Sequence, residues 1–176
     1  MLERLDPWYP RFWEVVRNEL YRSKQPTPED LHRLREEYGI KTVINLRGKR
    51  PDEEWFQKEK EACEELRIEM HSVEIPIKLN GKYGWANKLL TIYRKTARPI
   101  LVHCRKGSDR SGIASFLYLL QKGVPPCEAE NQLSTKYGHF SIFHRDYSEF
   151  IRHVKEGRLD VKEILNMPCE FDIPVI

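Results

Sequence analysis

The 176-residue sequence has little net charge, no C-x-x-C pair and no long apolar run. Its formal net charge of +3 is too small to favour nucleic-acid binding. No stretch approaches the roughly 20 apolar residues that a membrane-spanning helix needs, so we expect no transmembrane segment. The widely spaced cysteines argue against a zinc site and against a secreted disulfide framework, and they favour a reducing, cytoplasmic location. These are Cys63, Cys104, Cys127 and Cys169.

Strand-like and helix-like segments alternate along the chain, which predicts one α/β domain over residues 1–176. We expect its core over about 12–157 and an irregular tail over 158–176. The alternation predicts a mainly parallel central sheet with helices on both faces. The expected strands lie within 15–21, as a short strand or hairpin, and at 41–46, 68–75 and 99–103. The expected helices lie at 27–39, 51–66, 85–96, 113–120, 126–137 and 144–156.

Two details of this pattern are specific. Thr27 and Pro28 are typical of a helix start, as cap and first helical residue, and Gly39 is typical of a helix end. The Glu- and Lys-rich residues of the 51–66 helix are interpreted as a solvated face. Ligands of parallel α/β sheets bind at the carboxyl ends of central strands, which directs attention to the segment after residue 103.

That segment is His103-Cys104-Arg105-Lys106-Gly107-Ser108-Asp109-Arg110-Ser111-Gly112, between a strand and a helix N-terminus. A tight turn there directs successive backbone N–H groups inward, and the helix end adds partial positive charge, so the loop suits a phosphate dianion. The same field favours the thiolate of Cys104, which is the nucleophilic form. Gly107 and Gly112 permit the backbone shape and close packing that such a turn requires.

The other side chains of the segment have distinct expected roles. The Arg110 guanidinium can bind two phosphate oxygens at once and stabilise the transferring phosphoryl group. The Ser111 hydroxyl can hydrogen-bond to the sulfur, and His103 is expected to orient the loop. The expected phosphate-binding residues are Arg105, Lys106, Gly107, Ser108, Asp109 and Arg110.

The pattern His-Cys-x5-Arg-Ser-Gly, preceded by Ile100-Leu101-Val102, resembles the signature of the protein tyrosine phosphatase superfamily. It is most similar to small atypical dual-specificity phosphatases of bacterial, plant and fungal type. Tyr21-Arg22-Ser23-Lys24-Gln25-Pro26-Thr27 and Val43-Ile44-Asn45-Leu46-Arg47 resemble two further segments of those proteins. The resemblance implies hydrolysis of phosphate monoesters through a phosphocysteine at Cys104, with no metal and no cofactor.

The chain departs from this family in one respect. Members usually carry an aspartate after the strand that precedes the cysteine strand, and it protonates the leaving oxygen. Here the stretch after Pro76 contains no acid. Asp109 is the preferred substitute, as in myotubularin-like phosphatases, and Glu74 is the alternative. Asp109 could instead pair with an arginine or complement the helix end. The departure also leaves open a catalytically weak phosphate-binding module, that is, a pseudophosphatase.

Cationic residues cluster in the segments expected at the mouth of the site. Arg47 and Lys78 are the predicted substrate rim, beside Arg105 and Lys106 of the cysteine loop. Such a rim favours a substrate with several phosphates or acidic neighbours. The predicted partner is therefore a phosphorylated substrate, such as a phosphoprotein, an inositol phosphate or a phospholipid.

Overall fold

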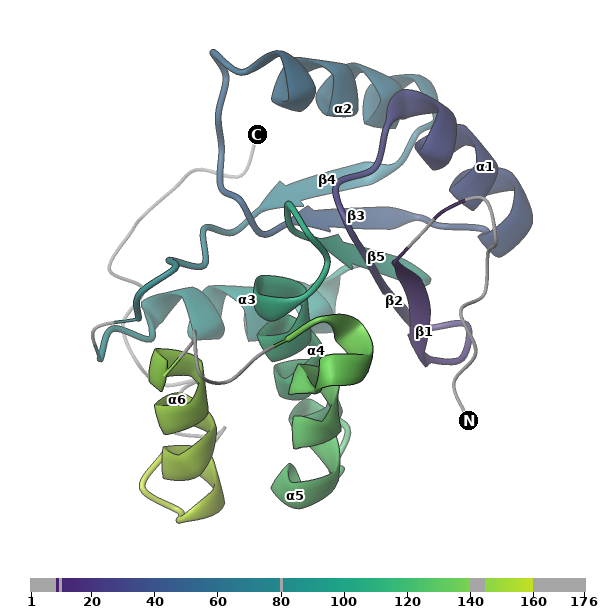
Figure 1. Ribbon diagram of the computed structural model, residues 1–176. Coiled ribbons are helices and arrows are strands. Elements are labelled where there is room, and N and C mark those ends of the chain that lie inside the picture. The colour runs from purple at the N-terminus through teal and green to yellow at the C-terminus, as the bar shows by residue number, and fades with distance from the viewer. Residues whose placement is uncertain (1–8, 10, 80, 140–144, 160–176) are drawn as a thin grey trace.

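The computed structural model describes residues 9, 11–79, 81–139 and 145–159. Within them the chain forms a five-stranded sheet with helices on both faces (Figure 1), which confirms the predicted fold class. The strands are β1 Phe12–Val16, β2 Leu20–Ser23, β3 Thr42–Asn45, β4 Glu69–Ser72 and β5 Ile100–His103. The α-helices are α1 Pro28–Tyr38, α2 Glu54–Glu65, α3 Gly84–Lys95, α4 Asp109–Gln121, α5 Pro126–Ala129 and α6 Arg145–Lys155; η1 Glu130–Leu133 and η2 Thr135–Tyr137 are 3₁₀-helices.

The sheet has the order β1-β2-β5-β3-β4, with the cysteine strand β5 at its centre. Only the β1–β2 hairpin pairs antiparallel among the described strands; the other three pairs are parallel. Ser23, His103, Asn45 and Ser72 lie in one row across β2, β5, β3 and β4. The four parallel strands therefore end at the same level, and the segments that follow them share one edge of the sheet.

Helices α1 and α2 cover one face of the sheet, and α3 and α4 lie against the other with α5 and α6 (Figure 1). Each face has its own apolar core. Leu31, Leu34, Val43 and Cys63 belong to the core under α1 and α2. Val102, Phe116 and Phe150 belong to the larger core on the opposite face. Both cores are built from central-strand residues that alternate between the faces, as the period of a strand requires.

The termini of helix α1 match the sequence prediction. The Thr27 side chain accepts a hydrogen bond from the Asp30 N–H, and Asp30 accepts one from the Thr27 N–H, forming a capping box. Gly39 ends the helix in the left-handed region, at a φ of 64°. The predicted hairpin is confirmed as β1 and β2.

The predicted helix over 126–137 is wrong in part, because the segment breaks into α5, η1 and η2. The Gln132 carbonyl accepts a hydrogen bond from the buried Arg22 guanidinium at 2.6 Å. This bond anchors η1 to β2, so a tertiary contact that no local pattern indicates sets the path of the segment. Among the described residues no helix has the length and apolar character needed to cross a membrane. Most of the predicted tail over 158–176 lies outside the described residues.

Candidate active site

Cys104 begins the turn between β5 and α4 and is almost completely buried, with 3% of its surface exposed. The Gly107 N–H donates a hydrogen bond to the Cys104 sulfur at 3.2 Å. The Ser111 hydroxyl oxygen lies 3.7 Å from the same sulfur, within hydrogen-bond reach. These two groups are donors for a thiolate. The sequence predicted the Ser111 hydroxyl at the sulfur, but it assigned Gly107 only to the shape of the turn and to phosphate binding.

Two glycines let the turn pack tightly against its surroundings. Gly107 has a φ of +76°, and a Cβ there would lie 2.6 Å from the backbone nitrogen of Lys24, just after β2. A Cβ on Gly112 would lie 2.8 Å from the Gln132 carbonyl oxygen. Neither position has room for a side chain, so the turn is pressed between β2 and η1.

Arg22 supports the loop from within the protein. The side chain is fully buried, and its Nη2 donates to the Gly107 and Ser108 carbonyls at 3.0 and 2.7 Å. These bonds hold the two carbonyls away from the concave side of the turn, where an anion needs N–H groups. Burial lowers the pKa of Arg22 to about 10, and negative charge on Cys104 opposes that shift. The sequence analysis quoted Arg22 only within a family segment and missed this role.

His103 and Glu59 form a buried pair beneath the other side of the loop. His103 Nε2 lies 2.5 Å from Glu59 Oε1, although the contact lacks the alignment of a hydrogen bond. The residue before the nucleophile is therefore in contact with a buried carboxyl group. The solvated-face interpretation of the 51–66 helix is wrong for Glu59, which is 1% exposed.

The burial of Glu59 could have been predicted from the sequence. Phe56, Glu59 and Cys63 follow one another at spacings of three and four residues, so they share the buried face of α2. A carboxylate on an apolar helical stripe is rare enough to indicate a specific partner.

Arg110 and Arg47 meet at the mouth of the loop. Arg110 Nη1 donates to the Leu46 carbonyl at 3.4 Å, so its guanidinium lies beside the end of β3. The pKa of Arg47 is lowered, first by partial burial and then by the positive charges of Arg110 and Arg105. The structure thus brings these three cations together. Lys78, the other predicted rim residue, is exposed on the segment after β4. Arg50 forms an ion pair with Glu74.

Asp109 occupies the first position of α4 and contacts a buried histidine. Its Oδ1 lies 2.8 Å from Nδ1 of His139, which is 3% exposed. The sequence analysis did not find this pair, since thirty residues separate its members and no spacing rule links them. Glu74, the alternative acid, is exposed and its Oε1 lies 2.5 Å from Arg50 Nη2.

The segment after β4 is attached to α6. The Tyr147 hydroxyl donates to the Pro76 carbonyl at 3.0 Å, and Asp146 accepts from the Leu79 N–H at 2.9 Å. Burial is the main cause of the raised pKa of Tyr147, and nearby Arg110 opposes it. Helix α6 therefore holds this segment through two side chains.

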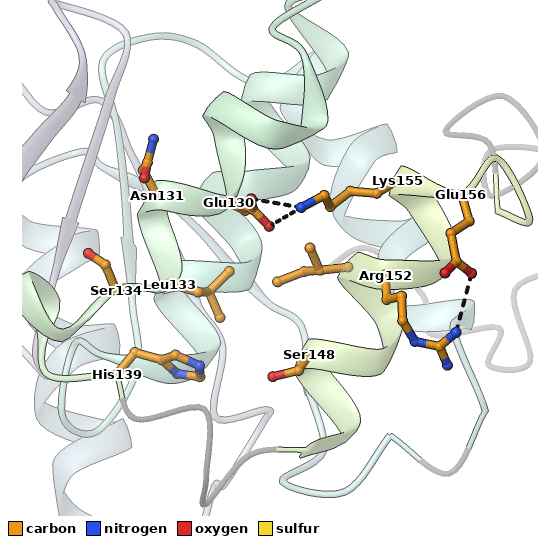
Figure 2. Close-up of a pocket in the computed structure, with 10 residues that line it drawn as sticks. Glu130, Asn131, Leu133, Ser134, His139, Ser148, Arg152, Lys155 and Glu156 are labelled. Carbon is orange, nitrogen blue, oxygen red and sulfur yellow. Dashed lines mark hydrogen bonds and ion pairs between the residues drawn. The ribbon is translucent and has the colours of Figure 1, made fainter.

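A separate cleft of about 650 Å³ lies between η1 and α6 (Figure 2). Ion pairs Glu130–Lys155 and Arg152–Glu156 lie on its walls. Cys104 and Arg110 do not line it, and it approaches the catalytic loop through His139. The cleft is therefore distinct from the phosphate site.

The fold and this cysteine loop define a cysteine phosphatase. Residues 13–147, well over half of the chain, match the family model described as "DSP-PTPase phosphatase fused to NAD+ Kinase", and the chain belongs to that family. No curated protein matches the sequence.

Several solved structures share the fold at low sequence identity. TpbA of P. aeruginosa is 20% identical, with 94% of each chain covered and a TM-score of 0.63. The core catalytic domain of the PP-IP phosphatase SIW14 from S. cerevisiae, in complex with citrate, is 21% identical, with 85% of this chain and 94% of that chain covered and a TM-score of 0.64. PTPMT1 is 15% identical, with 84% and 98% covered and a TM-score of 0.56.

Proposed function

We propose that this chain is a phosphatase of the tyrosine or dual-specificity type. It hydrolyses phosphate monoesters through a phosphocysteine at Cys104. The observation that carries the proposal is the environment of the Cys104 sulfur. A backbone N–H and a hydroxyl converge on it from one turn, and Arg110 lies at the mouth of that turn. A thiolate that accepts hydrogen bonds from these two groups, beside an arginine that can bind phosphate oxygens, is arranged for attack on phosphorus.

In the first step the loop N–H groups and Arg110 bind the non-bridging phosphate oxygens. The Cys104 thiolate attacks phosphorus, an S–P bond forms, and the P–O bond to the leaving group breaks. The leaving oxygen takes a proton from an acid. In the second step water attacks phosphorus and gives a proton to that same residue. The S–P bond breaks, inorganic phosphate forms, and Ser111 donates a hydrogen bond to the departing thiolate.

Asp109 is the proposed acid. Its contact with His139 fixes Oδ1, which orients the carboxyl group at the N-terminus of α4 beside Arg110. Glu74 is a weaker candidate because its carboxylate is paired with Arg50 at the surface. His139 is proposed as a positioning residue for this acid, through the same contact.

The proposed substrate carries more than one anionic group. Arg110 binds the phosphate to be transferred, while Arg47 and Arg105 add positive charge at the same mouth. Lys78 is proposed as a further rim residue on the segment after β4. Inositol phosphates, phospholipid head groups and acidic phosphopeptides share this chemistry. The proposed compartment is the cytoplasm, where a thiolate nucleophile remains reduced.

The test is hydrolysis of para-nitrophenyl phosphate with a chelator present, for the wild type, Cys104→Ser and Cys127→Ser. Cys127 is an exposed free thiol and serves as the matched control. We expect Cys104→Ser to lower kcat by at least about 10⁴-fold, because the nucleophile is lost, and Cys127→Ser to keep wild-type rates. Vanadate should inhibit the wild type.

Two outcomes would decide against this function. Full activity in Cys104→Ser would exclude the phosphocysteine route. Absence of turnover by the wild type, together with calorimetric binding of phosphate esters, would instead support the pseudophosphatase. Phosphate release from phosphopeptides, inositol phosphates, phospholipids and sugar phosphates then ranks the substrate classes. A single-phosphate sugar equal to the best polyanion would refute the role of the cationic rim.

A further inference from the structure

Glu59 is a buried carboxylate whose two oxygens serve two different parts of the site. Oε1 contacts His103, the residue before the nucleophile, and Oε2 accepts a hydrogen bond from the Gln25 side-chain amide at 2.9 Å. A buried carboxylate is costly unless partners compensate for lost water. His103 is one of these partners. Gln25 is the other, and its side chain also contacts Arg47 at the predicted substrate rim.

Glu59 and Arg47 together set which way the Gln25 amide faces. A guanidinium can only donate hydrogen bonds, so Gln25 presents its amide oxygen to Arg47 and its NH₂ group to the Glu59 carboxyl group. The amide oxygen then faces the other way, where it accepts from Arg47 Nη1 at 2.8 Å. The Gln25 backbone N–H also contacts the Arg105 carbonyl, at 3.5 Å, so this residue lies against the cysteine loop.

The same helix holds the other side of Arg47. Trp55 lies one helical turn before Glu59, and the Arg47 Cζ atom is 3.4 Å from the centroid of its ring. A guanidinium stacked on an indole keeps its edges available for planar hydrogen bonding. One edge is bound to Gln25. Helix α2 therefore contributes both the ring beneath Arg47 and the carboxylate behind Gln25.

We propose that Glu59 is a positioning residue that, through Gln25, holds Arg47 in place for a second anionic group of the substrate. The inference rests on the proposed function, since it assigns Arg47 to that second group. A preset guanidinium loses less side-chain entropy when the anion binds than a free surface arginine does. Gln25, Glu59 and Trp55 thus control selectivity between substrates while the cysteine loop performs the chemistry.

Calorimetry in the Cys104→Ser background tests this link without requiring turnover. The two probes are inorganic phosphate, which occupies only the loop, and inositol hexakisphosphate, which also reaches the rim. The measured quantity is the ratio of their dissociation constants. The variants are Arg47→Ala, Gln25→Ala, their double, and Glu59→Gln. Glu61→Gln is the matched control, because Glu61 is exposed on the same helix.

We expect Arg47→Ala to weaken hexakisphosphate binding by about 10-fold or more and to change phosphate binding by less than about two-fold. Gln25→Ala and Glu59→Gln should each weaken hexakisphosphate by about three- to ten-fold, and Glu61→Gln should have no effect. The double variant should bind no more weakly than Arg47→Ala alone, because Gln25 acts only through Arg47.

The alternative outcomes are separable. If Arg47→Ala changes the ratio but Gln25→Ala and Glu59→Gln do not, the rim is real and the positioning role is wrong. If Gln25→Ala and Arg47→Ala add fully in the double variant, the role is also wrong. If Arg47→Ala has no effect, the rim assignment fails and this inference fails with it. Should Glu59→Gln not fold, Glu59→Asp replaces it, because this variant keeps the carboxyl group but draws it away from Gln25 by one methylene. Unchanged hexakisphosphate binding in Glu59→Asp would overturn the positioning role.

Discussion

The segments that leave β5 and β4 reach the same edge of the sheet, but they are held in different ways. The cysteine loop is fixed from within, by hydrogen bonds from the fully buried Arg22 and by direct contact between Gly107 and β2. The segment after β4 is attached through two hydrogen bonds to α6, and its Ile77 side chain is 70% exposed. The cysteine loop is held by a buried side chain behind it, whereas the segment after β4 buries Ile75 and Leu79 in the core but carries Ile77 exposed between them.

This difference relates to the acid that is missing after Pro76. A proton donor must be placed within hydrogen-bond reach of the leaving oxygen, and a rigid element places it more accurately than a surface segment does. Asp109 lies on the rigid side, at the first position of α4 and in contact with buried His139. The comparison therefore predicts that substitutions in the cysteine loop affect catalysis far more than substitutions that loosen the other segment.

The largest effect is expected for Arg110→Lys. Lysine keeps the positive charge but cannot bind two phosphate oxygens with a planar fork, so kcat/KM on para-nitrophenyl phosphate should fall by about 10²- to 10³-fold. Arg94→Lys is the control, because Arg94 is exposed in the last turn of α3 and has no role in the site. A loss of less than about three-fold in Arg110→Lys would show that the loop does not use a bidentate arginine.

A smaller effect is expected for Asp109→Asn, and it should depend on the leaving group. An alkyl phosphate needs protonation of its leaving oxygen, so kcat should fall by about 10²-fold, whereas para-nitrophenyl phosphate should lose much less. Steady-state rates on both esters, measured across pH, provide the comparison.

Glu74→Gln is the matched control for the acid, since Glu74 is paired with Arg50 at the surface. It should keep wild-type rates on both esters. If Glu74→Gln loses the alkyl-ester activity while Asp109→Asn keeps it, the acid lies on the segment after β4 and the comparison is reversed.

The smallest effect is expected for Tyr147→Phe, which removes the hydrogen bond to the Pro76 carbonyl. Urea unfolding should show a loss of about 1 kcal/mol, the usual contribution of one such bond. The value of kcat/KM on para-nitrophenyl phosphate should change by less than about three-fold. A catalytic loss as large as that of Arg110→Lys would mean that the segment after β4 takes part in the chemistry.

The parts of the molecule that were predictable from sequence depend on local rules. The capping box at Thr27, the left-handed end at Gly39 and the strand-to-helix turn at Cys104 each follow from residues within a few positions of one another. Their geometry is set by the backbone, and residue type indicates it directly.

The parts that were missed depend on contacts between distant residues. His139 meets Asp109, Glu59 meets His103, and Arg22 meets Gln132 only because the sheet brings their elements together. The last contact anchors η1 to β2 within the predicted 126–137 helix, and no local pattern indicated it. Glu59 alone left a trace in the sequence, through its position on the apolar stripe of α2.

The row formed by Ser23, His103, Asn45 and Ser72 constrains how this protein can change over evolutionary time. Arg47 is two residues beyond the row and Cys104 is one. The row therefore sets how far each of them lies from the end of its strand. Deleting one residue within β3 would shift Arg47 by about 3.3 Å and turn each β3 side chain before it to the opposite face. Insertions after Ile75, by contrast, fall beyond the ordered ladder. Substrate range can thus diversify through segment length there, while the strand lengths stay fixed.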